Sequence, residues 1–538
     1  MGWNTIKLLE MKIALAQLNY TTGDIDGNAA KIAVAIDNAK AKGADLVVFA
    51  EQAISGSPAF DLLRKTTFLE LCDEALESIA THCKGITAIV GVPVLTNEGA
   101  ISAAAVVEDG KVVKIIGKHH ISARREMGFL VSAQGYEYIE VAGHRLAVVV
   151  GNDLSHIHDM EREADMIVSV NARRYGKDVL AYRYDTLRKI AFVEGKTLVF
   201  VNNVGGSGEL VFDGTSCVVS AKGDIVTLLE RCEEDEKIYD TENEPTPVTV
   251  MPYTTCNDHT RMLYRAACLG LKDYFAKSGY TKASIGLSGG IDSAVVACIA
   301  ADTLGKENVR ALLMPSPFTA ESSVEDAKAL AENLGIQYSV LPIMEAYNSV
   351  MDTLKPITGG TDFDATEENM QSRIRTIMLM ALQNKSGYVM LNSSNKSENA
   401  LGFCTLYGDT AGAFSVTGDL YKTEMYQLAR YINREFGNVI PESILTKEPS
   451  SELRPNHKDS DILPPYEVVD AILIRMIEEG QHREEIINAG FDSEVVEKIH
   501  SMIMRNEKKR YQFPPVLRLS SCAFKHERLM PLINKYSF

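Results

Sequence analysis

Apolar positions recur along the first 230 residues in two different rhythms. Short apolar runs rich in β-branched residues, typical of buried strands, alternate with stretches whose apolar residues return every three or four positions, as on one face of a helix. The helical stretches are residues 28–42 and 69–83. The strand-like runs are residues 12–17, 46–49, 87–92, 103–107, 111–116, 145–150, 166–170, 198–201 and 217–220. So many strands between so few helices predict an α/β sandwich rather than a simple βαβ barrel.

The rhythm stops near residue 233. Four acidic residues occupy positions 233–236, and Pro245 and Pro247 follow. This composition is typical of an inter-domain linker, because charge and proline disfavour packed structure. A chain of 538 residues is also too long for one hydrophobic core. We therefore predict a first domain at residues 11–232, a linker at 233–256 and a second domain at 257–538.

The second domain begins with a strand, a glycine turn and a helix. Residues 282–287 form the strand-like run, Gly289-Gly290 lie in the turn, and an apolar helical stretch continues to residue 304. Such a turn collects backbone N–H groups at a helix N-terminus, which is an arrangement that binds phosphate. The turn has no Walker lysine, and it carries an acid, Asp292. A carboxylate beside phosphate requires a divalent cation between them, so we expect Mg²⁺ here.

Two further polar stretches follow strand-like runs. Residues 315–323 come after the strand expected at 310–313, and together with Gly359-Gly360 they are candidates for a loop that closes over a ligand. The strand expected at 388–392 leads into a polar turn that places Glu398 where it could complete the cation site of Asp292.

Arg373 and Arg375 are two residues apart, so on a helix only one of them need face a phosphate or carboxylate.

Composition and charge narrow the class of protein. Hydrophobic content of 46% and charged content of 24% are ordinary for a soluble globular protein, and no apolar run approaches the length of a membrane span. A net charge of −17 disfavours binding to nucleic acid. The nine cysteines form no C-x-x-C pair, which indicates reduced, buried thiols rather than disulfides. We expect a cytoplasmic protein with neither a nucleic-acid nor a membrane partner.

The first domain resembles the nitrilase–amidase superfamily. The matching stretches are residues 11–19, 46–51, 117–122 and 204–214. The resemblance implies an αββα sandwich, a base at Glu51 and an oxyanion-stabilising lysine at Lys118. The family's nucleophilic cysteine should follow the strand at 145–150, but this chain has Gly151 and Asn152 there. Glycine has no side chain that could attack a carbonyl, and Cys72, Cys83 and Cys217 lie on other segments. We expect the domain to be catalytically dead, with Glu51 and Lys118 as relics.

The second domain resembles the NAD synthetase family over all of residues 257–538. Further matching stretches are residues 448–454, 463–466 and 506–512. The resemblance implies a doubly wound parallel sheet of the pyrophosphate-loop, adenine-nucleotide alpha-hydrolase-like type. It assigns Mg²⁺ to Asp292 and Glu398. It assigns deamido-NAD to Asn369, Arg373, Glu398 and Lys509. It assigns ATP to Gly286, Leu287, Ser288, Gly289, Gly290, Ile291, Asp292, Ser293, Ser393, Lys422 and Ser450.

The two resemblances together imply the glutamine-dependent, two-domain layout, in which the first domain releases ammonia for the second. The implied reaction is ATP-dependent amidation of deamido-NAD to NAD through an adenylate. Because position 151 is glycine, we expect ammonia to be the nitrogen source. The alternatives are a glutamine-dependent enzyme with an unrecognised nucleophile, another pyrophosphate-loop amide ligase, and a non-catalytic scaffold or sensor. The resemblance also implies a homo-oligomer, at least a dimer through the second domain.

Overall fold

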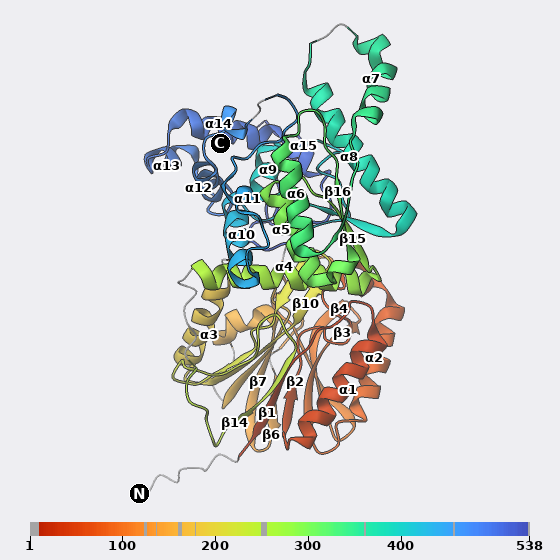
Figure 1. Ribbon diagram of the computed structural model, residues 1–538. Helices are drawn as coiled ribbons and strands as arrows, with labels where there is room; N and C mark the ends of the chain where they lie inside the picture. Colours follow the sequence, from red (N-terminus) through yellow and green to blue (C-terminus); the bar gives the residue numbers. More distant parts are fainter. Residues whose placement is uncertain are drawn as a thin grey trace, which may run out of the picture. The chain divides into compact units, whose positions relative to one another are not determined.

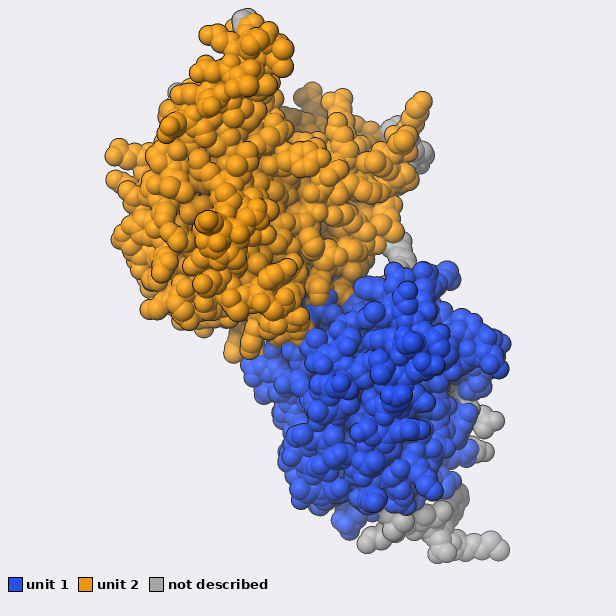
Figure 2. Space-filling model, turned by 90° about the vertical axis from the view of Figure 1, so that its right-hand side faces the viewer, with its two compact units in different colours: residues 1–175, 179–207, 211–252 blue, residues 176–178, 208–210, 253–538 orange. Residues whose placement is uncertain are grey.

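The computed structural model describes residues 10–122, 126–135, 137–159, 164–177, 179–248, 256–359, 362–455 and 458–535. The chain divides into two compact units, coloured separately in Figure 2. Unit 1 comprises residues 1–175, 179–207 and 211–252, and unit 2 comprises residues 176–178, 208–210 and 253–538. The change from one unit to the other at residue 252 falls inside the predicted linker.

Unit 1 contains two six-stranded sheets (Figure 1). The first has the order β14-β1-β2-β3-β4-β5 and the second the order β13-β12-β9-β8-β7-β6. The first sheet consists of β1 (Lys12–Gln17), β2 (Leu46–Val48), β3 (Thr87–Thr96), β4 (Gly99–Glu108), β5 (Lys111–Gly117) and β14 (Asp235–Asp240). The second consists of β6 (Tyr138–Val141), β7 (His144–Val150), β8 (Met166–Asn171), β9 (Thr197–Asn202), β12 (Cys217–Val219) and β13 (Ile225–Leu228). The short strands β10 (Val204–Ser207) and β11 (Leu210–Asp213) form a separate pair.

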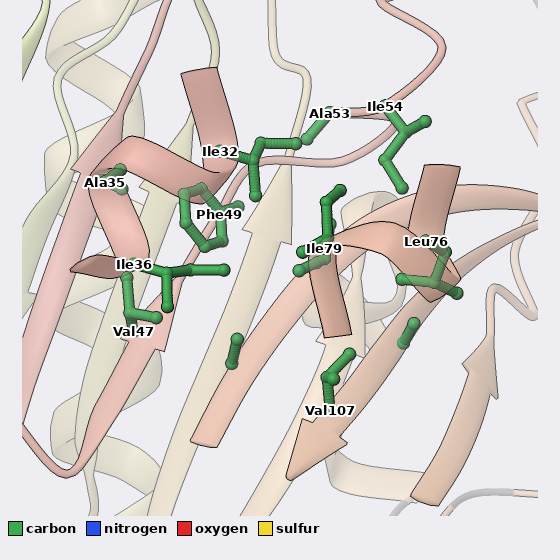
Figure 3. Close-up of a cluster of buried hydrophobic side chains, with 14 of the residues drawn as sticks. Ile32, Ala35, Ile36, Val47, Phe49, Ala53, Ile54, Leu76, Ile79 and Val107 are labelled. Atoms are coloured by element: carbon green, nitrogen blue, oxygen red, sulfur yellow. The ribbon is translucent and has the colours of Figure 1, made fainter. Parts of the chain in front are cut away.

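Helices cover the outer faces of these sheets. The helices are α1 (Ile25–Ala41), α2 (Thr66–Ala80) and α3 (Leu180–Glu194). Ile32 and Ile36 of α1 and Leu76 and Ile79 of α2 belong to one buried cluster (Figure 3). The cluster also contains Phe49, which follows β2, and side chains of the first sheet such as Val47 and Val107. The inner faces of the two sheets share a second cluster of buried aliphatic side chains, and α3 packs on β9 and β12. The predicted αββα sandwich is thus confirmed, and the apolar rhythm arises because both faces of each sheet are buried.

Part of the predicted linker is instead a strand. Residues 235–240 form β14, which pairs antiparallel with β1 at the edge of the first sheet. The linker prediction was wrong for these residues, because an edge strand tolerates acidic side chains that point into solvent while its backbone stays paired. Residues 249–255 of the predicted linker lie outside the described residues.

Unit 2 is built on a five-stranded parallel sheet with the order β17-β16-β15-β18-β19. Its strands are β15 (Lys282–Gly286), β16 (Val309–Leu313), β17 (Gln337–Val340), β18 (Tyr388–Asn392) and β19 (Phe414–Ser415). Its longer helices are α4 (Cys256–Ser278), α5 (Ile291–Leu304), α6 (Glu321–Leu334), α7 (Met344–Thr358), α8 (Ala365–Ser386), α10 (Lys422–Phe436), α12 (Tyr466–Ile477) and α14 (Ser493–Arg505). Its short helices are α9 (Lys396–Leu401), α11 (Glu442–Thr446), α13 (Arg483–Asn488) and α15 (Glu507–Arg510). The predicted parallel α/β fold is confirmed.

The carboxyl ends of β15 and β18, which pair side by side, lead into α5 and α9. Functional side chains at the starts of these helices are therefore brought to one edge of the sheet, where ligands bind in open α/β folds. No helix in the part of the chain that the structure describes is long and apolar enough to cross a membrane.

Candidate functional site

A cavity of about 310 Å³ opens at this edge of the sheet in unit 2. Its lining includes every residue that the sequence assigned to ATP. Those residues are Gly286, Leu287, Ser288, Gly289, Gly290, Ile291, Asp292, Ser293, Ser393, Lys422 and Ser450. The volume falls within the range of small-molecule sites. The structure therefore gathers four separate segments of the chain around one space.

The loop between β15 and α5 has the shape that its glycines allow. Gly289 has φ +79°, and a Cβ there would lie 2.2 Å from the Ser323 carbonyl oxygen, so no larger residue fits. The hydroxyl of Ser293 donates to the Gly290 carbonyl (3.1 Å), and Ser288 Oγ accepts from the Gly290 N–H (3.2 Å). Gly290 is the N-cap of α5, so the loop and the N-terminus of that helix together face the cavity. Backbone donors and a helix dipole at this place suit an anion such as phosphate.

Asp292 and Glu398 meet at a single lysine. Lys422 Nζ donates to Asp292 Oδ2 (2.6 Å) and to Glu398 Oε1 (3.2 Å), and its side chain is 5% exposed. Burial opposes the charge of Lys422, but the two carboxylates outweigh it and raise its pKa well above the usual value. Burial also raises the pKa of Glu398 to about 8; Lys422 opposes that shift and Asp292 adds to it. Near neutral pH the ammonium group of Lys422 is therefore balanced mainly by Asp292, while Glu398 keeps much of its proton.

The same carboxylates suit the Mg²⁺ that the sequence predicted. Asp292 and Glu398 come from different helices, both offer hard oxygen atoms, and both line the cavity. Among the described residues, no three His, Cys, Asp or Glu side chains lie close enough to hold an ion unaided. Mg²⁺ is usually held by one or two carboxylates together with substrate phosphates, and Asp292 and Glu398 would supply the carboxylates.

Of the two arginines left open by the sequence, Arg375 reaches the cavity. Arg375 lines it and donates through Nε to the Met314 carbonyl (2.9 Å), and burial lowers its pKa to about 10. Arg373 instead donates through Nε to the Leu406 carbonyl (3.2 Å), and it is not among the described lining residues. Their two-residue spacing on α8 points them apart, and only the packing of α8 decides which one faces the ligand.

The other residues assigned to deamido-NAD lie outside the described lining of this cavity. Asn369 Oδ1 accepts from the Thr405 hydroxyl (2.7 Å). Lys509 Nζ donates to the carbonyls of Gly402 (2.7 Å) and Cys404 (2.8 Å), just beyond the end of α9. Glu398 alone of the four is at the cavity. The structure thus does not bring Asn369, Arg373 and Lys509 together with the ATP residues in this space.

A loop around residues 447–453 was only partly anticipated, through Ser450. These residues line the cavity, and Glu452 accepts from the Ser323 hydroxyl (2.5 Å) and from the Ala320 N–H (3.2 Å). Of the predicted closing loops, the segment 315–323 contributes Pro315, Thr319 and Ser323 to the lining. Gly359 is not among the described lining residues, and Gly360 lies outside the described residues.

Unit 1 holds a second cluster, formed by Glu51, Lys118 and Gly151. Lys118 Nζ donates to Glu51 Oε1 (2.9 Å) and to Glu126 Oε1 (2.5 Å), and the Lys118 and Glu51 side chains are 3% and 6% exposed. Burial opposes the charge of Lys118, but Glu51 and Glu126 raise its pKa. Gly151 follows β7 with φ +54°, and a Cβ built there would lie 2.7 Å from Glu51 Oε2 and 2.8 Å from Lys118 Nζ. Glu51, Lys118 and position 151 therefore face one another.

Two members of this cluster had no sequence signal of their own. Glu126 was found only through its contact with Lys118, and Arg173 through a hydrogen bond from Nη2 to the Gly151 carbonyl (3.2 Å). The cysteines are poor substitutes for a nucleophile here. Burial raises the pKa of Cys72 and of Cys217 to about 12 and that of Cys83 to about 11, so each stays a protonated thiol.

Comparisons with known proteins assign a family to each of the two units. Residues 12–241 match the family model for carbon-nitrogen hydrolases, and residues 263–513 match that for NAD synthase. A glutamine-dependent NAD(+) synthetase of Aquifex aeolicus is 38% identical, in an alignment that covers 98% of this chain and all of that protein. The protein of the same name from Acinetobacter baylyi is 37% identical over 97% of this chain and 98% of its own.

A solved structure is similar along the whole chain. It is the glutamine-dependent NAD+ synthetase of Acinetobacter baumannii in complex with adenosine diphosphate, with 35% identity, a TM-score of 0.78, and coverage of 98% of this chain and 99% of that one. The two resemblances inferred from the sequence are therefore confirmed. This chain belongs to the glutamine-dependent NAD(+) synthetase family.

Proposed function

We propose that this protein converts deamido-NAD to NAD by ATP-dependent amidation and that ammonia is its nitrogen source. The observation that supports the first part is the cavity of unit 2, where the loop at residues 286–293 meets Asp292, Glu398 and Lys422. The observation that supports the second part is Gly151, which faces Glu51 and Lys118 without a side chain.

The reaction has two steps with different demands on the site. First, a carboxylate oxygen of the nicotinate group bonds to the α-phosphorus of ATP, and the bond from that phosphorus to the bridging oxygen breaks, which releases pyrophosphate. Then ammonia bonds to the carboxyl carbon, the carbon–oxygen bond to AMP breaks, and the nitrogen loses a proton. The first step develops negative charge on pyrophosphate, and the second needs an adenylate protected from water.

The residues at the cavity match the first demand. The backbone N–H groups of the loop and the N-terminus of α5 face the cavity and would bind the leaving pyrophosphate, and the ammonium group of Lys422 would neutralise part of its charge. Asp292 and Glu398 would hold Mg²⁺, which when bound supplies further neutralisation of phosphate charge. Arg375 adds a buried guanidinium for a phosphate or carboxylate group of either substrate.

The second demand involves the loop at residues 447–453. Glu452 ties this loop to Ser323 and to the backbone at Ala320, and those residues begin α6. A loop fastened over the cavity in this way would keep water from the adenylate. Asn369, Arg373 and Lys509 remain proposed contacts of deamido-NAD, supported by the family resemblance alone.

Ammonia as nitrogen source follows from the chemistry of unit 1. An amidase of the nitrilase type needs a thiol between a base and a cation, because the thiolate attacks the amide carbon. Here Glu51 and Lys118 are hydrogen-bonded to each other, and Gly151 has only a hydrogen atom as its side chain. The protein's relatives are named glutamine-dependent, so this chain would differ from them in that one respect.

One assay separates the candidates. Purified protein is incubated with Mg-ATP and deamido-NAD, and either ammonium or glutamine is supplied while NAD is measured. We expect NAD with ammonium and none above background with glutamine. NAD formed at comparable rates from glutamine, in a preparation free of other glutaminases, would refute the ammonia proposal and favour an unrecognised nucleophile. Amidation of other carboxylates in preference to deamido-NAD would favour another ligase, and no amide product at all would favour a scaffold.

A homo-oligomer and a cytoplasmic location complete the proposal. The first is supported by the resemblance to a family whose synthetase domains share an interface, and light scattering on the purified protein tests it. The second is supported by the thiols: Cys72, Cys83 and Cys217 are free and buried, as expected in a reducing compartment.

A further inference from the structure

Two helices of unit 2 begin at the cavity and carry its charged side chains. Glu398 lies in the first turn of α9, and Lys422 is the first residue of α10. The Nζ atom of Lys422 lies 3.2 Å from Glu398 Oε1. Both side chains have several rotatable bonds, so their separation depends on how firmly the first turns of the two helices are held.

A buried carboxylate on a third helix joins these first turns. Asp470 belongs to α12 and is 2% exposed. Its Oδ1 accepts a hydrogen bond from the Ser397 hydroxyl of α9 (2.5 Å), and its Oδ2 accepts one from the Thr423 N–H of α10 (2.9 Å). The Ser397 hydroxyl oxygen in turn accepts from the N–H of Lys422 (2.9 Å). The three bonds form a closed ring through the backbone of α10, so neither helix can shift without breaking one of them.

The same helix also flanks the lysine side chain. Tyr466 lies four residues before Asp470, hence on the same face of α12, and its ring centroid is 5.4 Å from Lys422 Nζ. The Tyr466 hydroxyl donates to Asp459 Oδ2 (2.9 Å), and Asp459 lines the cavity. One face of α12 therefore fixes the backbone of Lys422 through Asp470 and contacts its ammonium group through Tyr466.

The buried carboxylate of Asp470 is explained by its hydrogen bonds and not by contact with a ligand. Asp470 is not among the described residues that line the cavity, so it stands behind the wall of the site. Burying a carboxylate is costly unless its oxygens are satisfied, and here one oxygen is bonded to each of the two helices.

We propose that Asp470 is a positioning residue of the synthetase site, which through Ser397 and Thr423 fixes the first turns of α9 and α10 and thereby the separation of Glu398 and Lys422. This inference rests on the proposed function of the cavity. Displacing a reacting group by about 1 Å can reduce the rate of the chemical step by roughly a hundredfold. Ground-state binding of deamido-NAD involves other parts of the site and should change much less.

The test uses two substitutions and one matched control in the full-length protein. Asp470→Asn keeps the shape of the side chain and can still accept from Thr423, but its NH2 group can only donate to Ser397, which reverses that bond and removes the negative charge. Ser397→Ala removes the hydroxyl that links Asp470 to the N–H of Lys422. The control is Asp273→Asn, which alters a buried carboxylate of α4 that pairs with Lys277 (3.2 Å) in the same unit. Circular dichroism and thermal unfolding are measured for each variant beside the kinetics.

With ammonium as the nitrogen source, we expect Asp470→Asn and Ser397→Ala each to lower kcat about ten- to a hundredfold while the KM for deamido-NAD stays within about threefold. The double variant should lose little more than the worse single one, because both changes open the same ring. Asp273→Asn should keep kcat within about threefold. The proposal is overturned if folded Ser397→Ala, which opens the ring outright, keeps wild-type kcat, or if the kcat of both variants falls only as much as that of Asp273→Asn at an equal loss of thermal stability.

A binding measurement separates this inference from the proposed function. Isothermal titration with Mg²⁺ and α,β-methylene-ATP, which cannot release pyrophosphate, reports the geometry around Lys422 without turnover. We expect affinity to fall about three- to tenfold in Asp470→Asn and to be unchanged in Asp273→Asn. Absence of NAD formation by the wild-type protein would refute the proposed function, and the titration would still decide on Asp470. Equal affinities of wild type, Asp470→Asn and Ser397→Ala for the analogue would refute the positioning role.

Discussion

Replacing Gly151 by alanine tests whether the amidase site of unit 1 has closed around the missing nucleophile. The change adds one methyl group at a position with φ +54°. That methyl carbon would lie 2.7 Å from Glu51 Oε2 and 2.8 Å from Lys118 Nζ. If Glu51 and Lys118 have filled the space that a nucleophile would need, alanine must push them away and destabilise unit 1.

Two contributions set the size of the effect. Holding an L-residue at this left-handed φ costs about 1–2 kcal/mol relative to glycine. Relieving the contacts requires Glu51 and Lys118 to retreat by roughly 0.7 Å each, which weakens a buried ion pair whose complete loss costs about 3–5 kcal/mol. Both contacting atoms end flexible side chains, so only part of that loss applies. We expect a total of about 2–4 kcal/mol of lost unfolding free energy.

Gly195→Ala is the matched control, because it isolates the backbone contribution. Gly195 ends α3 in the same unit with φ +63°, and nothing lies within 4 Å of a Cβ built there. Alanine at this position should therefore cost only the backbone strain of about 1–2 kcal/mol. The difference between the two variants measures the displacement of Glu51 and Lys118.

The assay is thermal unfolding followed by circular dichroism, with hydrogen-exchange mass spectrometry on peptides of β2 and β7 to assign the change to unit 1. Each kcal/mol lowers Tm by about 2–4 °C for a unit of this size. We expect Gly151→Ala to unfold several degrees below Gly195→Ala. Equal Tm values for the two variants would show that Glu51 and Lys118 have not closed on position 151.

Three further predictions concern the synthetase cavity and the thiols. Asp292→Asn should lower the rate of NAD formation with ammonium at least about a hundredfold, since one of the two carboxylates proposed for Mg²⁺ is lost. The rate is measured as NAD per minute, and full activity of the variant would contradict that role. Arg375→Lys should lower kcat/KM for one of the two substrates about tenfold or more, because lysine cannot both donate to the Met314 carbonyl and present a planar fork to the ligand. An unchanged kcat/KM for ATP and for deamido-NAD would show that Arg375 contacts neither substrate. With a pKa of about 12, only about one Cys217 side chain in ten thousand is a thiolate near pH 8, so iodoacetamide should leave Cys72 and Cys217 of the native protein unmodified by mass spectrometry. Rapid alkylation of either cysteine would show a reactive thiol and make that residue a candidate nucleophile.

The elements that the sequence predicted well are those with a strong local signal. The strand expected at 388–392 agrees with β18, and the helix expected to run to residue 304 ends there, with Gly305 as its cap. Buried strands and capped helices can be predicted from a few adjacent residues. The sequence predicted a linker at residues 235–240, and the structure has a strand there. The acidic composition suggested a linker, but the segment pairs with β1, which lies more than 200 residues earlier in the chain.

The candidate site divides in the same way. The loop at residues 286–293 was assigned from its own letters, since a strand, two glycines and a helix start form a contiguous unit. Arg375 and Glu126 could not be assigned with comparable certainty, because their roles depend on which way a helix faces and on what a distant segment brings beside them.

By itself, the sequence determined the order of the two domains, the family they resemble, the glycine loop between a strand and a helix, and the lack of a thiol at position 151. Only the tertiary structure decided that Asp292 and Glu398, more than 100 positions apart, share Lys422, and that Gly151 faces Glu51 and Lys118. It also joined α9, α10 and α12 through Asp470. The physical reason is that identity and local pattern are properties of neighbouring residues, whereas distance and burial between remote side chains arise only when the packed core selects one arrangement of its elements.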